Sequence, residues 1–284
     1  MQYKNIIILG TSRLAAVCGK EIKDKIYEVI IIDTNKVPNK ILEMTCEKMG
    51  LLYCFFNERE REKFIINKKG NTLLFSITNP WIIPKMILKK KGLKAINFHH
   101  SLLPRHPGRN AEAWAIFEGD PQAGITWHYI TPNIDMGDII IQRGIKLNQD
   151  ITSLKLLRIQ DRLAEEAFKT VVDNILGDKA CSVPQDIRLR SKMHYSWEAP
   201  NDGYLDPNWE SNIVSRYLRA MDYGPLEVLG KPRIIVSDKE YTWKTYSISD
   251  TDKKGDMNIT IIDDYIILDR EQMQFKLYNI ERIG

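Results

Sequence analysis

The sequence contains no long apolar segment. The nearest candidate, LLYCFF at residues 51–56, is six residues long, whereas a membrane-spanning helix needs about 18 or more. The first ten residues hold one lysine and an apolar run of only four residues, which is too short for the core of a signal peptide. We therefore expect a cytoplasmic protein that has no membrane association.

Cysteine is also scarce, since the 284 residues include only four. Cys18, Cys46, Cys54 and Cys181 show none of the spacings that are typical of metal ligands. We interpret them as reduced, mostly buried thiols, as expected in a reducing compartment. A chain of this length buries roughly three quarters of its unfolded surface, so it needs neither a metal nor a disulfide to fold.

The chain lacks a large excess of either charge, because 41 basic and 37 acidic residues leave a net charge of +4. The distribution is nevertheless uneven. Residues 1–184 hold 27 basic and 20 acidic residues, a net +7, whereas residues 185–284 hold 14 and 17, a net −3. A C-terminal part of this sign would repel a polyanion, so it is not expected to clamp a nucleic acid.

Short apolar runs alternate with helical patterns through the first hundred residues. We expect strands at 5–10, 27–33, 51–56, 72–77 and 93–98, and helices at 14–22, 37–50 and 81–92. Strands that alternate with helices are joined by crossovers and run parallel. The pattern predicts an α/β fold of the Rossmann-like type, an open and mostly parallel twisted sheet with flanking helices. Ligands of such sheets bind beyond the carboxyl ends of the strands.

The pattern changes in the later part of the chain. A helix is expected at 110–119, a pair of strands at 124–130 and 138–145, and a long amphipathic helix at about 151–177. A further helix at 208–222 precedes several short strands, one of them over 240–248. We therefore expect three parts, namely a large domain at 1–184, a linker at 185–207 and a small β-rich C-terminal domain at 208–284.

The densest polar stretch, residues 96–114, begins where a parallel strand ends. Asn97 and His99 are two residues apart, so in an extended strand their side chains project to the same face. An amide can stabilise a developing oxyanion and an imidazole can move a proton, so the pair suits chemistry at a carbonyl. The structural alternative is that Asn97 caps a turn and that His99 is a hydrogen-bonded core histidine.

A second polar feature is Asp135, in a loop between two apolar strands, with Gly137 allowing a tight turn. A carboxylate at this position could orient an imidazole and raise its basicity. The alternative is an aspartate that only shapes the turn.

Together these motifs resemble those of the folate-dependent formyltransferases. The similarity consists of Asn97-Phe98-His99, Ser101-Leu102-Leu103-Pro104, Gly108, Trp114, Gly124-Ile125-Thr126 and Asp135-Met136-Gly137-Asp138 in this order. It covers about residues 1–180 well and extends more weakly to 201–222. The family includes glycinamide ribonucleotide, methionyl-tRNA and amino-sugar-nucleotide formyltransferases.

The resemblance implies an enzyme that transfers a formyl group from 10-formyltetrahydrofolate to a primary amine and that requires no metal. It implies that Asn97 donates a hydrogen bond to the oxyanion and that His99 assists proton removal. Asp135 would hold His99 and help to pass the proton toward the departing folate nitrogen. Residues 1–184 would then be the catalytic domain.

The resemblance also implies where the ligands bind. The pterin is expected near residues 76–85 and the 131–135 loop, largely through backbone contacts. The residues expected to bind the donor are Asn79, Trp81, Ile82, Ile83, Thr131 and Ile134. Those expected to bind the acceptor are Ser101, Arg105, Arg109 and Asn110. The two arginines suit a diphosphate, and their alternative is a pair of solvated loop residues.

Other ligand classes lack their sequence signatures. Gly10 and Gly19 do not form the dinucleotide fingerprint G-x-G-x-x-G, and no P-loop sequence is present. His99 could suggest a metal cluster with His100, His106 and His128. In a strand, however, the side chains of His99 and His100 project to opposite sides. No carboxylate or thiol repeats nearby, so a metal site is not expected.

The expected acceptor is the amine of a nucleotide-linked amino-deoxysugar, as in surface-polysaccharide biosynthesis. The chain length, the short linker and the small β module resemble the sugar enzymes. Methionyl-tRNA is the first alternative. Arg105 follows Ser-Leu-Leu-Pro as in the tRNA enzymes, but no basic insertion follows the second strand, and the residues after Arg105 depart from their W-R-G-A-A-P pattern.

Three further alternatives stay open. Glycinamide ribonucleotide enzymes usually end near the long helix, and this chain continues for about 100 residues beyond it. A small amine such as a hydroxylated ornithine is a second option, and an inactive folate- or nucleotide-binding module is the non-enzymatic one. For assembly, the apolar segments 241–243 and 265–268 could form a homodimer contact or the core of their own module.

Overall fold

The computed structural model describes residues 3–25, 27–179, 181–252 and 258–283. Contacts between residues divide the chain into two compact units. The first comprises Met1–Pro107, Gly124–Gly144 and Ile159–Lys192, and the second comprises Gly108–Ala123, Ile145–Arg158 and Met193–Gly284. Each unit combines distant segments, and the domain limits at 184 and 207 stay a prediction. None of the described helices has the length and apolar character needed to cross a membrane.

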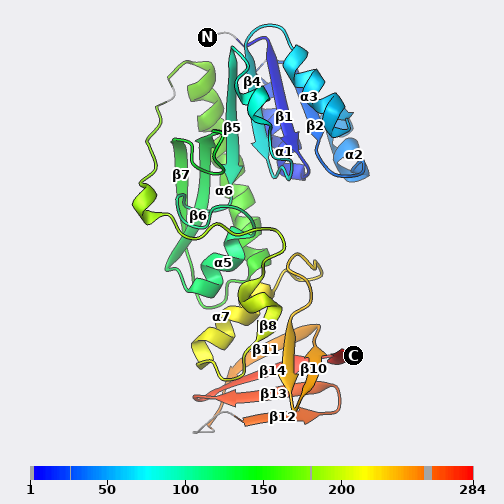
Figure 1. Cartoon of the computed structure of the whole chain (residues 1–284), viewed down its shortest axis with the longest axis vertical. Helices are drawn as coiled ribbons and strands as arrows, with labels where there is room; N and C mark the ends of the chain where they lie inside the picture. Colours follow the sequence, from blue (N-terminus) through cyan, green and yellow to red (C-terminus); the bar gives the residue numbers. More distant parts are fainter. Residues whose placement is uncertain (1–2, 26, 180, 253–257, 284) are drawn as a thin grey trace. The chain divides into compact units, whose positions relative to one another are not determined.

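The first unit is built on a seven-stranded sheet with the order β3-β2-β1-β4-β5-β6-β7 (Figure 1). The strands are β1 (Asn5–Gly10), β2 (Val29–Asp33), β3 (Leu52–Phe55), β4 (Thr72–Ile77), β5 (Leu93–His99), β6 (Gln122–Tyr129) and β7 (Ile139–Lys146). Neighbouring strands from β3 to β5 are parallel, and β6 runs antiparallel to β5. The mostly parallel α/β sheet expected from the sequence is confirmed.

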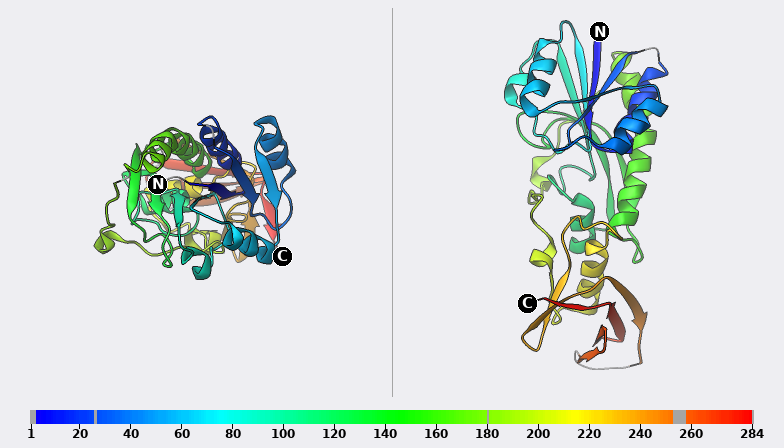
Figure 2. Two further views of the ribbon diagram at one scale, coloured as in Figure 1. Left: turned by 90° about the horizontal axis from the view of Figure 1, so that it is seen from above. Right: turned by 90° about the vertical axis from the view of Figure 1, so that its right-hand side faces the viewer.

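Helices cover both faces of this sheet. They are α1 (Arg13–Lys23), α2 (Lys40–Lys48), α3 (Glu58–Asn67), α4 (Lys85–Leu88) and the larger part of α6 (Ser153–Leu176). Alternation along β1 explains the two faces. Ile6 and Ile8 pack with α1 and α6, whereas Ile7 and Leu9 pack with α3 and α4. In the right-hand view of Figure 2, α3 (cyan) lies on one side of the sheet and α6 (green) on the other.

Two elements of the first unit differ from the sequence expectation. Helix α3 was not expected, because its first turns are almost entirely charged, yet Asn57 and Glu60 form a capping box that starts it. The helix expected over 81–92 is only the single turn α4. Pro84 directly precedes this turn. Because a proline disfavours the helical conformation at the residue before it, the helix does not extend back toward residue 81.

The second unit contains α5 (Ala111–Glu118), α7 (Ser211–Met221) and two four-stranded sheets, with the orders β15-β10-β9-β8 and β11-β14-β13-β12. The strands are β8 (Tyr204–Leu205), β9 (Arg233–Val236), β10 (Lys239–Thr242), β11 (Thr245–Asp250), β12 (Asn258–Ile262), β13 (Tyr265–Arg270), β14 (Met273–Tyr278) and β15 (Glu281–Ile283). The β-rich C-terminal module expected from the sequence is confirmed.

Within this module, the single strand expected over 240–248 is wrong. The chain passes from β10 in one sheet to β11 in the other, and the break falls at Trp243, whose side chain enters the core. Ile266 and Leu268 belong to the same core. Most apolar side chains of segments 241–243 and 265–268 thus pack in the core of their own module. A homodimer stays a prediction.

The packing of α6 beneath the site-bearing strands generates a stability prediction. Phe168 of α6 is fully buried, and its ring lies 5.0 Å from Phe75 of β4 and 5.0 Å from Trp127 of β6. Phe168→Ala should lower the free energy of unfolding by about 3–5 kcal/mol, because a cavity replaces the ring. Denaturant unfolding followed by circular dichroism measures the change. Thr170→Ala, at an exposed position of the same helix, should stay within about 0.5 kcal/mol of the wild type. Equal stabilities of the two variants would contradict this packing.

Candidate functional site

His99 is the last residue of β5, at the edge where ligands of parallel sheets bind. Its side chain is only 8% exposed. Nε2 lies 2.8 Å from the backbone carbonyl oxygen of His106. A carbonyl oxygen can only accept a hydrogen bond, so Nε2 carries the hydrogen. In the neutral ring Nδ1 therefore carries none, and its lone pair is available to accept a proton.

Asp135 faces that bare nitrogen. Its Oδ2 lies 3.7 Å from Nδ1 of His99, and its Oδ1 lies 3.6 Å from Nε2 of His128. Both distances are too long for a hydrogen bond but close enough for a strong electrostatic effect. The carboxylate is 9% exposed, so solvent screens these interactions only weakly.

His128 joins the site from β6, where it pairs directly with Asn97 of β5. Its Nδ1 lies 2.8 Å from the carbonyl oxygen of Tyr129, which places the hydrogen on Nδ1. Nε2 then accepts a hydrogen bond of 3.1 Å from the amide nitrogen Nδ2 of Asn97. This bond fixes which end of the amide is the nitrogen, and it leaves the second N–H of Asn97 for another acceptor.

Burial is the main influence on the charge of His99. Loss of solvation lowers its pKa, while the carboxylate of Asp135 and the carbonyl of His106 act in the opposite direction. The ring is therefore held neutral, with its proton-accepting nitrogen directed at an anion. A proton that reaches Nδ1 gains the attraction of Asp135 at once, so the group can accept a proton and release it again.

The loop that carries Asp135 is held by the segment expected to be only a linker. Gln185 donates through Nε2 to the carbonyl oxygens of Asp135 (3.0 Å) and Gly137 (2.7 Å). Arg190 donates to the carbonyl oxygens of Asp135 (3.1 Å) and Ile134 (3.0 Å). Asp135 itself has a left-handed backbone with φ of 51°, which aspartate tolerates better than most residues. These bonds secure the conformation that aims the carboxylate at the histidines.

The loop after β4 is also built rigidly. Asn79 accepts from the backbone nitrogen of Trp81 and donates to its carbonyl oxygen, both at 3.0 Å. The guanidinium of Arg61, a buried residue of α3, lies 4.8 Å from the centre of the Trp81 ring, in the range of a cation–π contact. Ile83 is buried in the apolar core that includes residues of α3 and α4, whereas Ile82 is exposed. The loop thus offers a fixed backbone with an apolar tip.

The loop after β6 has a similar character. Thr131 donates through Oγ1 to the carbonyl oxygen of Asn133, and Ile134 is exposed. Fixed backbone groups with the exposed apolar side chains Ile82 and Ile134 suit a planar heterocycle such as a pterin. The six residues expected to bind the donor therefore fit such a group, and their role stays a prediction.

The residues expected to bind the acceptor are divided between the units. In the first unit, Ser101 is buried and donates to the carbonyl oxygen of Arg105, so its hydroxyl shapes the loop. Arg105 and Arg109 are exposed. Asn110 precedes α5 with φ of 55° and belongs with Arg109 to the second unit. Their part in acceptor binding stays a prediction.

His100 serves a different purpose from its neighbour. Its Nε2 lies 3.0 Å from Oδ1 of Asp161 on α6, and its backbone carbonyl accepts from Gln160. His100 therefore fastens the end of β5 to the helix. The expectation that the site holds no metal stays a prediction.

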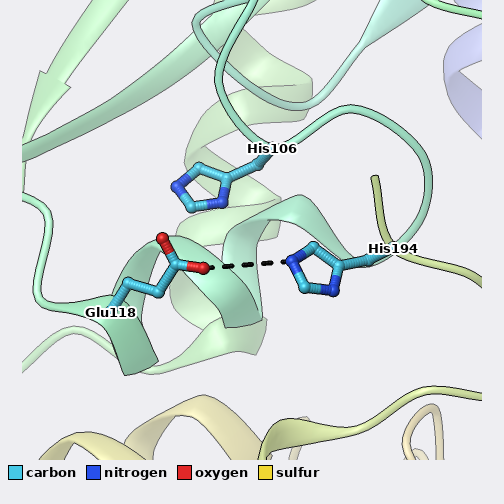
Figure 3. Close-up of side chains that lie close together, drawn as sticks. All are labelled: His106, Glu118 and His194. Atoms are coloured by element: carbon cyan, nitrogen blue, oxygen red, sulfur yellow. Dashed lines mark ion pairs between the residues drawn. The ribbon is translucent and has the colours of Figure 1, made fainter. Parts of the chain in front are cut away.

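In the second unit, His194 stands at the centre of a separate polar group. Its Nε2 lies 3.9 Å from Oε1 of Glu118, a contact drawn as a dashed line in Figure 3. Its Nδ1 lies 3.4 Å from Glu198, and its ring stacks on Trp114 with 3.6 Å between the centroids. His106, labelled in the same figure, belongs to the first unit.

Sequence reasoning missed four residues that this geometry makes important. His128 was considered only as a metal ligand, although its place opposite Asn97 follows from the antiparallel pairing of β5 and β6. Gln185 and Arg190 lay in a segment without periodicity. Arg61 lay in the helix that was not expected. No local signal in the sequence could have connected the last three with the site.

The chain matches a known family over the region that carries most of these side chains. Residues 80–175 match the family model described as formyl transferase. The resemblance inferred from the sequence motifs is thereby confirmed.

Individual relatives agree with this match. Over 145 residues the chain is 31% identical to GDP-perosamine N-formyltransferase of Brucella melitensis, an alignment that covers 51% of this chain and about half, 54%, of that relative. It is 23% identical to methionyl-tRNA formyltransferase of Clostridioides difficile over 95% of this chain and 93% of that one. The fold is similar to that of an N-formyltransferase from Helicobacter canadensis solved with folinic acid and dTDP-3-aminofucose, with a TM-score of 0.76, 16% identity and coverage of 99% and 100%.

The opposing influences on His99 generate a titration prediction. Burial should place its pKa below the ordinary value of about 6.5. Asp135→Asn removes an anion that favours the imidazolium, so the His99 pKa should fall further. NMR titration of the imidazole resonances measures both values. A His99 pKa that rises or stays unchanged in Asp135→Asn would contradict the electrostatic role given to this carboxylate.

Proposed function

We propose that this chain transfers a formyl group from 10-formyltetrahydrofolate to the amine of a nucleotide-linked amino-deoxysugar. The observation that carries the proposal is the convergence of Asn97, His99 and Asp135 at the end of β5, within a region that matches formyl transferases. An amide donor, a neutral imidazole and a carboxylate suit acyl transfer to an amine.

In this proposal the amine attacks the formyl carbon and the formyl oxygen becomes an oxyanion. Asn97 donates its second N–H to that oxyanion, since its first is bound to His128. Because this donor is already oriented, no reorganisation is needed as the charge develops. His128 contributes by holding the amide in place.

The proton is handled by His99 and Asp135. As the new C–N bond forms, the amine nitrogen loses a proton to Nδ1 of His99, where the carboxylate stabilises the imidazolium. When the bond between the formyl carbon and N10 of the folate breaks, N10 takes this proton. The products are the N-formyl amine and tetrahydrofolate, and the imidazole returns to its neutral form.

The donor site is assigned to the loops that follow β4 and β6. Asn79 and Trp81 would present fixed backbone groups to the pterin, and Ile82 and Ile134 would cover its faces. Ile83 and Thr131 would support these loops from within. When bound, the folate supplies the activated formyl group, and these residues orient it toward His99.

Charge and similarity favour the sugar nucleotide over a tRNA acceptor. The net −3 of residues 185–284 opposes a polyanion. The similarity to GDP-perosamine N-formyltransferase supports a sugar amine, while the similarity to methionyl-tRNA formyltransferase makes tRNA the second candidate. We also propose that the enzyme is cytoplasmic, that it uses no metal, and that Arg105 and Arg109 bind the acceptor diphosphate.

The catalytic assignment is tested by replacement of single side chains. His99→Asn and Asp135→Asn should each lower kcat/KM by about 10²–10⁴-fold, because each removes part of the proton-transfer step. Release of tetrahydrofolate in the presence of an amino-sugar nucleotide measures the rate. The matched control is His100→Asn, which should retain activity within a few-fold. Near-normal rates of the first two variants would reject their roles.

The acceptor assignment is tested by direct comparison of substrates. The purified chain is given 10-formyltetrahydrofolate with GDP- and dTDP-linked amino sugars, or with methionyl-tRNA, and products are identified by mass. A formylated amino sugar is the expected product. Formylation of the tRNA without any activity on the sugar nucleotides would overturn the assignment. Absence of any formylated amine, from a folded sample that binds folate, would overturn the enzymatic function itself.

A further inference from the structure

An exposed pair of stacked aromatic rings stands in the second unit. Tyr195 and Trp197 lie nearly parallel, with an interplanar angle of 8° and 4.7 Å between their centroids. Trp197 is 78% exposed, and no other large apolar residue that the structure describes is more exposed. Because the two rings hold each other, their outer surface is flat and already ordered.

The backbone beneath these rings is firmly anchored. Glu198 donates its backbone N–H to the carbonyl of Tyr195, and its carboxylate accepts from the Tyr195 nitrogen at 2.9 Å. One residue earlier, His194 stacks on Trp114 of α5. The pair therefore projects from a closed turn that is fixed to a helix, so little conformational entropy would be lost on binding a ligand.

The same turn is hydrogen-bonded to Arg109, which belongs to the same unit. The backbone nitrogen of Arg109 donates to the carbonyl of His194 at 2.9 Å. A Cβ at Gly108 would overlap that carbonyl, so only glycine allows this approach. The turn with the aromatic pair thus lies beside Arg109, whose side chain is exposed. The carboxylate of Glu198 interacts within the turn. It accepts from the backbone nitrogen of Tyr195 and lies 3.4 Å from Nδ1 of His194.

A flat aromatic surface beside a guanidinium matches the chemistry of a nucleotide. Planar bases stack on tryptophan and tyrosine rings, and arginine forms paired hydrogen bonds with phosphate oxygens. We propose that Trp197, supported by Tyr195, is the stacking surface for the base of the acceptor nucleotide, with Arg109 directed at its phosphates. This assignment rests on the proposed function, which it extends from a sugar amine to the recognition of the nucleotide.

Stacking on a ring without base-specific hydrogen bonds tolerates different bases. The surface therefore predicts binding of both purine and pyrimidine nucleoside diphosphates, with the larger purine bound at least as tightly. It also predicts that inorganic pyrophosphate, which has no base, gains nothing from Trp197.

The test measures binding rather than turnover, on the full chain. Titration calorimetry with GDP, dTDP and pyrophosphate is carried out on the wild type, Trp197→Leu and Trp197→Phe. Trp197→Leu should weaken nucleotide binding about 5- to 150-fold, as expected for the loss of one base–aromatic stack. Trp197→Phe should recover most of the affinity, and pyrophosphate binding should be equal in all three proteins. The matched control is Ile235→Ala, at an exposed apolar position of β9 in the same unit, which should leave every affinity unchanged.

Three outcomes would overturn the assignment: equal nucleotide affinities of the wild type and Trp197→Leu, equal losses of nucleotide and pyrophosphate affinity, or no nucleotide binding by the wild type. Failure of the proposed function looks different. Nucleotide binding that depends on Trp197, without formyl transfer, would reject the reaction and keep the stacking surface. Formyl transfer to a sugar nucleotide at the wild-type KM in Trp197→Leu would reject the surface and keep the reaction.

Discussion

Two backbone carbonyls fix the chemistry of the site by deciding which nitrogen of each histidine carries a hydrogen. The carbonyl of His106 takes the Nε2–H of His99, and the carbonyl of Tyr129 takes the Nδ1–H of His128. Nδ1 of His99 lies 3.7 Å from Asp135. Nε2 of His128 lies 3.6 Å from Asp135 and accepts a hydrogen bond from Asn97. In the neutral state the site thus places an anion against the bare nitrogen of His99, an arrangement that a proton on that nitrogen would stabilise. In the proposed reaction, the attacking amine would provide that proton as the new bond forms.

Other contacts within the first unit hold these groups in position. The antiparallel pairing of β5 with β6 sets Asn97 opposite His128, which a purely parallel sheet would not do. Gln185 and Arg190 donate to the backbone carbonyl of Asp135. Hydrogen bonds from another segment therefore hold the loop that directs the carboxylate at the histidines. Burial then keeps solvent from screening the charges and holds His99 neutral.

The sequence was informative where structure follows from local pattern. Apolar runs such as 5–10 and 72–77 predicted the buried strands to the residue. The motifs around Asn97, His99 and Asp135 pointed to side chains that the structure brings together, while their catalytic roles stay a proposal. It was uninformative where contacts join distant segments. Helix α3 is too charged to show an apolar face, and the break between β10 and β11 depends on burial of Trp243. The clamp on Asp135 requires a chain return of about 50 residues, which no local pattern encodes.

The central claim is that, before any proton is transferred, Nδ1 of His99 faces Asp135 without a hydrogen while Nε2 of His128 accepts from Asn97. The direct measurement is the tautomeric state of both rings, obtained from ¹⁵N chemical shifts at neutral pH in the protein without ligands. The account predicts a hydrogen on Nε2 of His99 and on Nδ1 of His128, with the opposite nitrogen of each ring unprotonated. A hydrogen on Nδ1 of His99 in the resting protein, already shared with Asp135, would contradict it.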